Sequence, residues 1–153
     1  MADQLVDFIR SRKEKASGPD INWEETKDAW VRSVEGLYRD IQEMLRDSIA
    51  SSDVKIRTFV VEVAEDYIGT YSIPVLELKV GMDRVEFRPK GINVYRAAGR
   101  VDIRGDRDSV TLIRNSVNAD TGWSVINQRA PQLKTVQLDR ESLKYVLERV
   151  MLP

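Results

Sequence analysis

Apolar and polar residues alternate along residues 84–114, and this alternation predicts the framework of the protein. Apolar side chains recur at every second position in three places, with charged residues between them. Antiparallel strands with one solvated face have this period of two. The stretch therefore predicts four short strands separated by turns at 89–91, 97–99 and 105–108, with one apolar face formed by Val85, Phe87, Val101, Ile103, Val110 and Leu112.

Strands are also predicted on both sides of this stretch. Residues 56–63 are apolar on both faces in their middle, which is typical of a central strand. Residues 73–80 predict another strand with Pro74 near its start, because proline cannot donate to the hydrogen-bond ladder. Extended segments at 123–126 and 136–138 complete an antiparallel meander of about six or seven strands.

Two helices are predicted before the meander. Residues 3–15 have the spacing of a short amphipathic helix. A long helix is predicted over residues 23–50, because Asn22 is a suitable N-cap and Glu25 follows it by three residues. Its apolar residues fill an arc of about 140° on a helical wheel. An arc this wide suits a helix that covers a sheet, and it contains Trp23, Trp30, Val34, Leu37, Tyr38, Ile41, Met44, Leu45 and Ile49.

A further helix is predicted at the end of the chain. Asp139 is a suitable N-cap, and Leu138 and Leu143 have the spacing of a hydrophobic staple. The sequence contains no internal repeat and no low-complexity linker. We therefore predict a single α+β domain over residues 1–153, in which residues 1–51 are helical, residues 55–138 form the meander and residues 139–151 form the C-terminal helix.

The amino-acid composition excludes several kinds of chemistry. The chain contains neither cysteine nor histidine. Serine–histidine and cysteine–histidine catalysis are therefore excluded in this chain alone, as are thiolate and imidazole metal sites. We expect no cofactor and no bound metal, and the composition favours a non-catalytic role.

Charge is distributed unevenly although the net charge is only −1. Residues 17–53 contain nine acidic and four basic residues, and residues 84–114 contain eight basic and four acidic residues. The first segment therefore has a charge of −5 and the second +4. Segments of opposite sign attract each other within a monomer or across an oligomer, and a basic face also attracts polyanions.

The basic excess provides a candidate binding surface. Arginine matches the geometry of phosphate and carboxylate groups, and Tyr95 and Trp123 are aromatic residues suited to stacking on nucleic-acid bases. Neighbouring acids such as Glu86 and Asp102 are expected to neutralise part of the charge by cross-strand ion pairs. The candidate binding residues are Arg84, Arg88, Arg96, Arg100 and Arg104.

A second candidate site consists of Asp66, Glu77 and Lys79. This arrangement of an aspartate followed about ten residues later by Glu-x-Lys resembles the metal-dependent nucleases of the restriction-endonuclease-like fold. The resemblance implies two carboxylates that bind Mg²⁺ and a lysine that stabilises charge. The chain departs from that fold, because a meander follows the Glu-x-Lys segment where the nucleases have a helix and a further strand.

These observations favour a non-catalytic protein-interaction or accessory module that binds a protein partner or associates with itself. The alternatives are a nucleic-acid-binding protein that uses the arginine-rich face, and the metal-dependent nuclease. The sequence contains no apolar run of the roughly 18 residues needed to span a membrane, and its first residues lack the pattern of a secretory signal. We therefore expect a cytoplasmic protein with no membrane partner.

Overall fold

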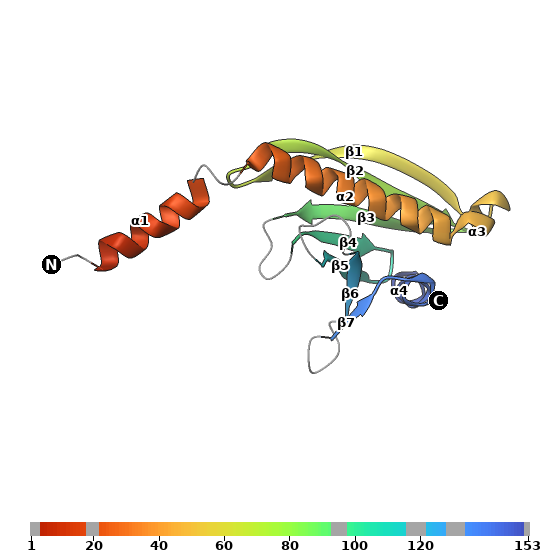
Figure 1. Cartoon of the computed structure of the whole chain (residues 1–153). Helices are drawn as coiled ribbons and strands as arrows, with labels where there is room; N and C mark the ends of the chain where they lie inside the picture. The colour runs from red at the N-terminus through yellow and green to blue at the C-terminus, as the bar shows by residue number, and fades with distance from the viewer. Residues whose placement is uncertain (1–3, 18–21, 93–97, 116–121, 128–133, 152–153) are drawn as a thin grey trace.

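Seven antiparallel strands follow one another across a single sheet, each paired with the next strand along the chain (Figure 1). The structure is a computed structural model and describes residues 4–17, 22–92, 98–115, 122–127 and 134–151. The predicted α+β class and antiparallel meander are confirmed. The strands are β1 (Lys55–Glu65), β2 (Gly69–Val80), β3 (Asp83–Gly91), β4 (Arg100–Arg104), β5 (Ser109–Arg114), β6 (Trp123–Asn127) and β7 (Lys134–Gln137).

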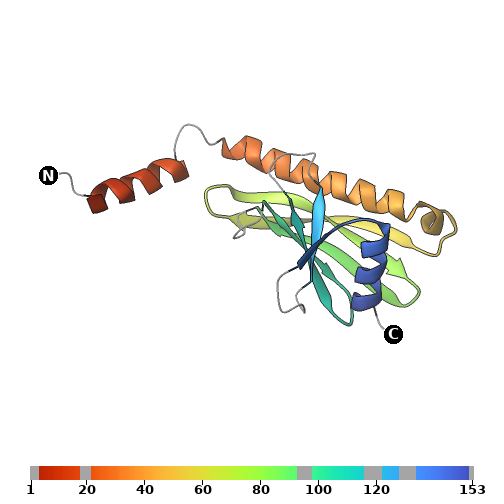
Figure 2. The same cartoon turned by 60° about the horizontal axis from the view of Figure 1, so that its bottom comes forward.

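The long helix and the C-terminal helix pack on one face of this sheet (Figure 1), called the inner face below. The long helix lies along the inner face, the C-terminal helix lies beside the last strands, and the first helix lies apart from the sheet (Figures 1 and 2). Figure 2 shows the same separation of the first helix after a 60° rotation. The helices are α1 (Gln4–Ser17), α2 (Trp23–Met44), α3 (Arg46–Ala50) and α4 (Arg140–Val150).

The long helix α2 begins as predicted but ends earlier. The Oδ1 atom of Asn22 accepts a hydrogen bond from the backbone N–H of Glu25 at 3.0 Å, which caps the first turn. The helix passes through Gly36 and ends at Met44, and Leu45 separates it from α3. The prediction of one helix to residue 50 was therefore wrong. The break allows Ile49 of α3 to pack against the core, whereas a straight helix to residue 50 would extend about 42 Å.

The alternating pattern of β3, β4 and β5 produces the predicted apolar face. All six of its apolar residues are buried on the inner face under α2 and α4, namely Val85, Phe87, Val101, Ile103, Val110 and Leu112. The described part of residues 84–114 contains three strands rather than four. Residues 89–91 do not form the predicted turn, because β3 continues to Gly91 through a register shift.

The first strand lies at an edge of the sheet, which contradicts its predicted central position. Its apolar residues have different surroundings along the strand. Ile56, Val61 and Val63 pack against the core, whereas Phe59 lies under the guanidinium groups of Arg57 and Arg88 at 5.1 and 6.0 Å from the ring centre. An edge strand therefore has the composition expected of a central strand.

Tyr38 connects α2 to two strands where their pairing ends. The register between β2 and β3 runs only as far as Leu76 opposite Phe87. The hydroxyl of Tyr38 lies between these strands, 2.8 Å from the carbonyl oxygen of Pro74 and 2.9 Å from that of Phe87. Burial raises the pKa of this phenol. The hydroxyl thus provides a donor to carbonyl groups that the separating strands no longer satisfy.

Trp30 connects α2 to the other half of the sheet. Its indole ring is fully buried and lies 5.8 Å from the ring of Trp123 on β6. The ring also lies against the backbone of Gly99, where an added Cβ atom would be 2.2 Å from a ring carbon. Glycine is therefore required at position 99, both for this approach and for its backbone φ of +142°.

We predict that Gly99→Ala lowers the free energy of unfolding by about 3 kcal/mol or more, because the new methyl group displaces Trp30 from its packed position. The matched control is Gly81→Ala. Gly81 also has a positive φ of +60°, but an added Cβ would meet no atom within 4 Å, so the expected loss is only about 1 kcal/mol. Urea unfolding of both variants measures the difference, and equal losses would contradict the packing described for Trp30.

Candidate binding surface on the sheet

The outer face of the sheet, which lies opposite the inner face, gathers charged side chains from four strands. Residues directly opposite each other in antiparallel strands share a face, so the register of β1 to β4 defines the membership of this surface. Seven of its charged residues are basic and three are acidic, which gives a charge of +4. They are Lys55, Arg57, Glu77, Lys79, Arg84, Glu86, Arg88, Arg100, Asp102 and Arg104.

Four of the five predicted binding arginines lie together on this face. Arg84 and Arg88 belong to β3, and Arg100 and Arg104 belong to β4. Arg88 lies directly opposite Asp102, and Arg104 lies opposite Glu86. Arg96, the fifth predicted residue, and Tyr95, the aromatic residue next to it, are outside the described residues.

Ion pairs neutralise part of the outer face, but among the described residues only one of the three pairs crosses between strands as predicted. Nη2 of Arg57 lies 3.1 Å from Oε2 of Glu77 on the neighbouring strand. Arg88 pairs with Glu86 at 3.3 Å, and Arg100 pairs with Asp102 at 2.7 Å, each along its own strand. Each of the three acids is therefore engaged by an arginine, and four basic residues remain.

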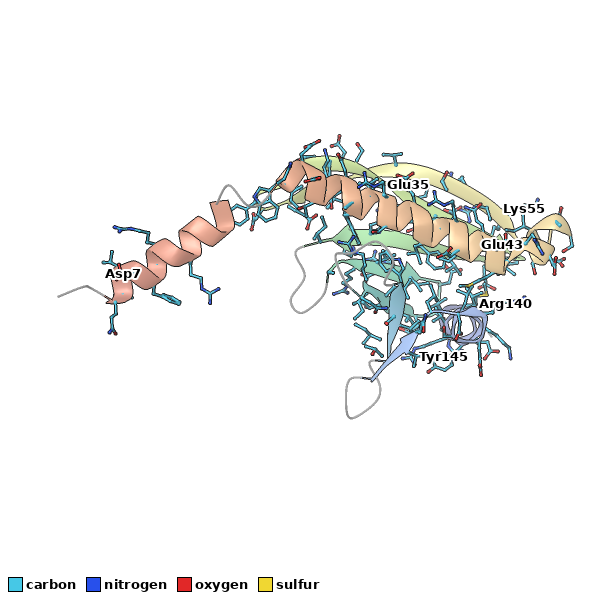
Figure 3. All side chains as sticks on the ribbon, viewed as in Figure 1. Asp7, Glu35, Glu43, Lys55, Arg140 and Tyr145 are labelled. Atoms are coloured by element: carbon cyan, nitrogen blue, oxygen red, sulfur yellow. The ribbon has the colours of Figure 1, made fainter. Side chains whose placement is uncertain are left out.

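Three of these remaining bases form a row across three strands, called the cationic row below. Lys55 of β1 lies directly opposite Lys79 of β2, and Lys79 lies directly opposite Arg84 of β3. All three side chains are exposed, and Lys55 lies at the end of the sheet where α3 leads into β1 (Figure 3). No ion pair involves them within the part of the chain that the structure describes.

The cationic row opposes folding locally, because like charges directly opposite each other destabilise a sheet. Their Cβ atoms are about 5 Å apart at such positions. One step further along the same strands, Arg57 faces Glu77 instead. The stability of the fold therefore does not account for the three positive charges of the row. The row presents these charges together to solvent.

Arg114 was counted with the basic segment but lies on the inner face. It is only 3% exposed. Its Nε donates to the carbonyl oxygen of Ala98 and its Nη1 to the hydroxyl of Ser33, both at 2.8 Å. The guanidinium lies 5.1 Å from the Trp30 ring centre, and burial lowers the pKa of Arg114. The inward orientation of Arg114 could have been predicted from the sequence, because position 114 continues the inward-facing alternation of Val110 and Leu112.

Trp123 is also unavailable to a partner. It is buried against Trp30 and is 7% exposed, so it cannot stack on a nucleic-acid base. Strands β1 to β4 contain three aromatic residues. Tyr71 and Phe87 are buried, and the guanidinium groups of Arg57 and Arg88 lie over the ring of the third, Phe59.

The structure does not bring together the three residues that resemble a nuclease site. Asp66 belongs to the turn after β1, beyond the pair formed by Glu65 and Gly69. Glu77 lies eight residues further along β2, which corresponds to about 26 Å of strand. Glu77 and Lys79 do share a face, but among the described residues no group of three or more acidic side chains is positioned to hold a metal ion.

The chain matches no protein-family model, no curated protein and no solved structure. Within the described residues, none of the helices has the combination of length and apolar character needed to cross a membrane. The interpretation of the outer face therefore rests on its geometry and charge.

We predict that Lys79→Gln raises the free energy of unfolding by about 0.5 kcal/mol at low salt, because it removes the central charge of the cationic row. The gain should disappear in about 1 M salt, where the screening length falls to about 3 Å. Lys144→Gln is the matched control, since Lys144 is exposed on α4 and pairs with Glu148 at 3.3 Å. Urea unfolding at both salt concentrations tests the expectation, and a loss of stability for Lys79→Gln would contradict it.

Proposed function

We propose that this protein is a non-catalytic interaction module that binds an acidic segment of a partner protein across the cationic row. The observation that carries the proposal is the alignment of Lys55, Lys79 and Arg84 on three adjacent strands. The repulsion within this row is relieved when carboxylates of a partner lie between the bases. The paired arginines beside the row provide further donors at its border.

Two features favour a binding role over catalysis. The chain has no histidine or cysteine, and the described groups with shifted pKa values do not converge on an open site. Burial in the core shifts the pKa values of Tyr38, Tyr71 and Arg114. Asp139 has a lowered pKa because it caps α4 through the backbone N–H of Ser142. Lys27 has a raised pKa because it pairs with Glu24. Each of these groups has a structural partner.

Two further features favour an acidic protein segment over a nucleic acid. Base recognition on a sheet uses exposed aromatic rings, and Trp123 and Phe59 are covered as described above. The exposed side of α2 is acidic, because α2 contains six acidic and three basic residues. A long polyanion that wraps around the molecule would meet this negative helix, whereas a short acidic segment contacts the outer face alone.

We predict that the wild-type protein binds a fluorescent polyglutamate peptide at low salt and that Lys55→Gln/Lys79→Gln/Arg84→Gln weakens this binding by roughly threefold to a hundredfold. Exposed ion pairs contribute about 0.2–1 kcal/mol each, and three of them are removed. Fluorescence anisotropy measures the dissociation constants, and binding should weaken with increasing salt.

The control is Arg32→Gln/Arg39→Gln/Lys144→Gln, which changes the net charge equally at three exposed helical positions. It should retain the wild-type dissociation constant within about twofold. Equal losses in both triple variants would contradict binding at the cationic row. A single-stranded oligonucleotide that binds more tightly than the peptide would favour the nucleic-acid alternative instead.

A further inference from the structure

The first helix presents apolar side chains to solvent. Phe8 is 57% exposed and Ile9 is 58% exposed, and Leu5 and Val6 beside them are 65% and 45% exposed. Figures 1 and 3 show α1 apart from the sheet, with its side chains directed into the surroundings. An exposed apolar stripe on a helix marks an interaction surface more often than a single exposed residue does.

A basic residue continues the apolar stripe of α1. Arg12 follows Phe8 by one helical turn, and its guanidinium lies 5.5 Å from the centre of the Phe8 ring. Asp7 lies on the opposite side of the helix, because it is separated from Ile9 by two residues and thus by about 200°. A surface complementary to α1 must therefore have an apolar floor and an acidic border.

Two grooves on the body of the protein have apolar floors, and the charges at their borders differ. The first, of about 620 Å³, lies between the end of α2 and α4 and is bordered by Arg140, Lys144 and Glu148. The second, of about 440 Å³, lies between β7 and α4 and is lined by Val125, Val136, Asp139, Glu141, Ser142 and Tyr145. The border of the first groove is predominantly basic, and that of the second, called the β7–α4 groove, is acidic.

The β7–α4 groove has the chemistry that α1 requires. Val136 is 52% exposed and Tyr145 is 49% exposed, so both apolar walls are accessible. Asp139 is engaged as the N-cap of α4, through a hydrogen bond of 2.8 Å from the backbone N–H of Ser142. Glu141 is exposed one helical turn before Tyr145, and it is therefore the acid that faces an incoming base.

We propose that α1 of one copy docks into the β7–α4 groove of a second copy. Phe8 and Ile9 then lie between Val136 and Tyr145, and Arg12 lies beside Glu141. The exchange is reciprocal, because each copy contributes one helix and one groove, and it forms a closed dimer. This contact is separate from the cationic row, so its test does not depend on the proposed binding of an acidic partner.

We predict that the wild-type chain sediments as a dimer in equilibrium with a monomer and that Phe8→Ser/Ile9→Ser sediments as a monomer. Removing two apolar anchors from each of two equivalent contacts should weaken the dimer at least about a hundredfold. Circular dichroism verifies that the variant remains folded, since both residues are exposed. A wild-type monomer at every concentration would overturn the proposal, as would a dimer unaffected by the two substitutions.

Charge reversal identifies the groove and distinguishes docking between copies from docking within one copy. Arg12→Glu alone and Glu141→Arg alone should each weaken the dimer about tenfold, because each variant places like charges together at both contacts. An equimolar mixture of the two variants should regain the wild-type dissociation constant. In the mixed dimer, one contact has the reversed pair and the other has the original pair.

Each result of the mixing experiment shows whether α1 of one copy docks at Glu141 of another copy. Recovery of the dimer supports the exchange of α1 between copies at Glu141. Failure of the mixture to recover, although each variant is weakened, would overturn the pairing of Arg12 with Glu141. In the control mixture of Arg12→Glu with Lys144→Glu, the mixed dimer should remain weaker than the wild-type dimer, because Lys144 borders the other groove and one of the two contacts still places like charges together.

Discussion

The packing of α2 against the inner face is the constraint on which the remaining structure depends. Trp30 is held between Gly99, Trp123 and the guanidinium of Arg114, and it connects the helix to β4, β5 and β6. Tyr38, two turns further along α2, is hydrogen-bonded to the carbonyl groups of β2 and β3. These contacts attach the helix to the inner face of the sheet from β2 to β6. A shift of one residue in any strand would exchange its apolar and charged faces.

The composition of the outer face follows from this constraint. Once the apolar residues of β2 and β3 are directed toward α2, Lys79 and Arg84 must face outward and lie opposite each other. The helix that buries the inner face has its acidic residues on its exposed side, so the two exposed sides of the molecule have opposite charge. The cationic row is thus a local cost that a more favourable sequence would avoid. The binding role proposed for the outer face would account for this cost.

The regular periods in the sequence predicted much of the fold. The alternation in β3 to β5, the N-cap at Asn22 and the N-cap at Asp139 all depend on neighbouring residues, and they were confirmed. The errors arose where tertiary contacts, and not neighbouring residues, determine the structure. The position of β1 at the edge depends on strand order, and the break at Leu45 accompanies the packing of Ile49 of α3 against the core.

The regular alternation along the strands also predicted part of the candidate binding surface. Alternation alone placed Arg84, Arg88, Arg100 and Arg104 on one face, but Arg88 and Arg100 pair with acids of their own strands and not across strands as predicted. The contributions of Lys55 and Lys79 were missed, because the register between strands determines which charges lie opposite each other. That register is not encoded in the period of any single strand.

The most direct test of the central claim is a map of the backbone amide signals that change when the wild-type protein binds the polyglutamate peptide. Nuclear magnetic resonance of the full chain provides this map. We expect the largest shifts at Lys55, Lys79 and Arg84 and at their neighbours on the outer face, with α2 unaffected. Shifts concentrated on α2 or α4, with none along the cationic row, would contradict this expectation.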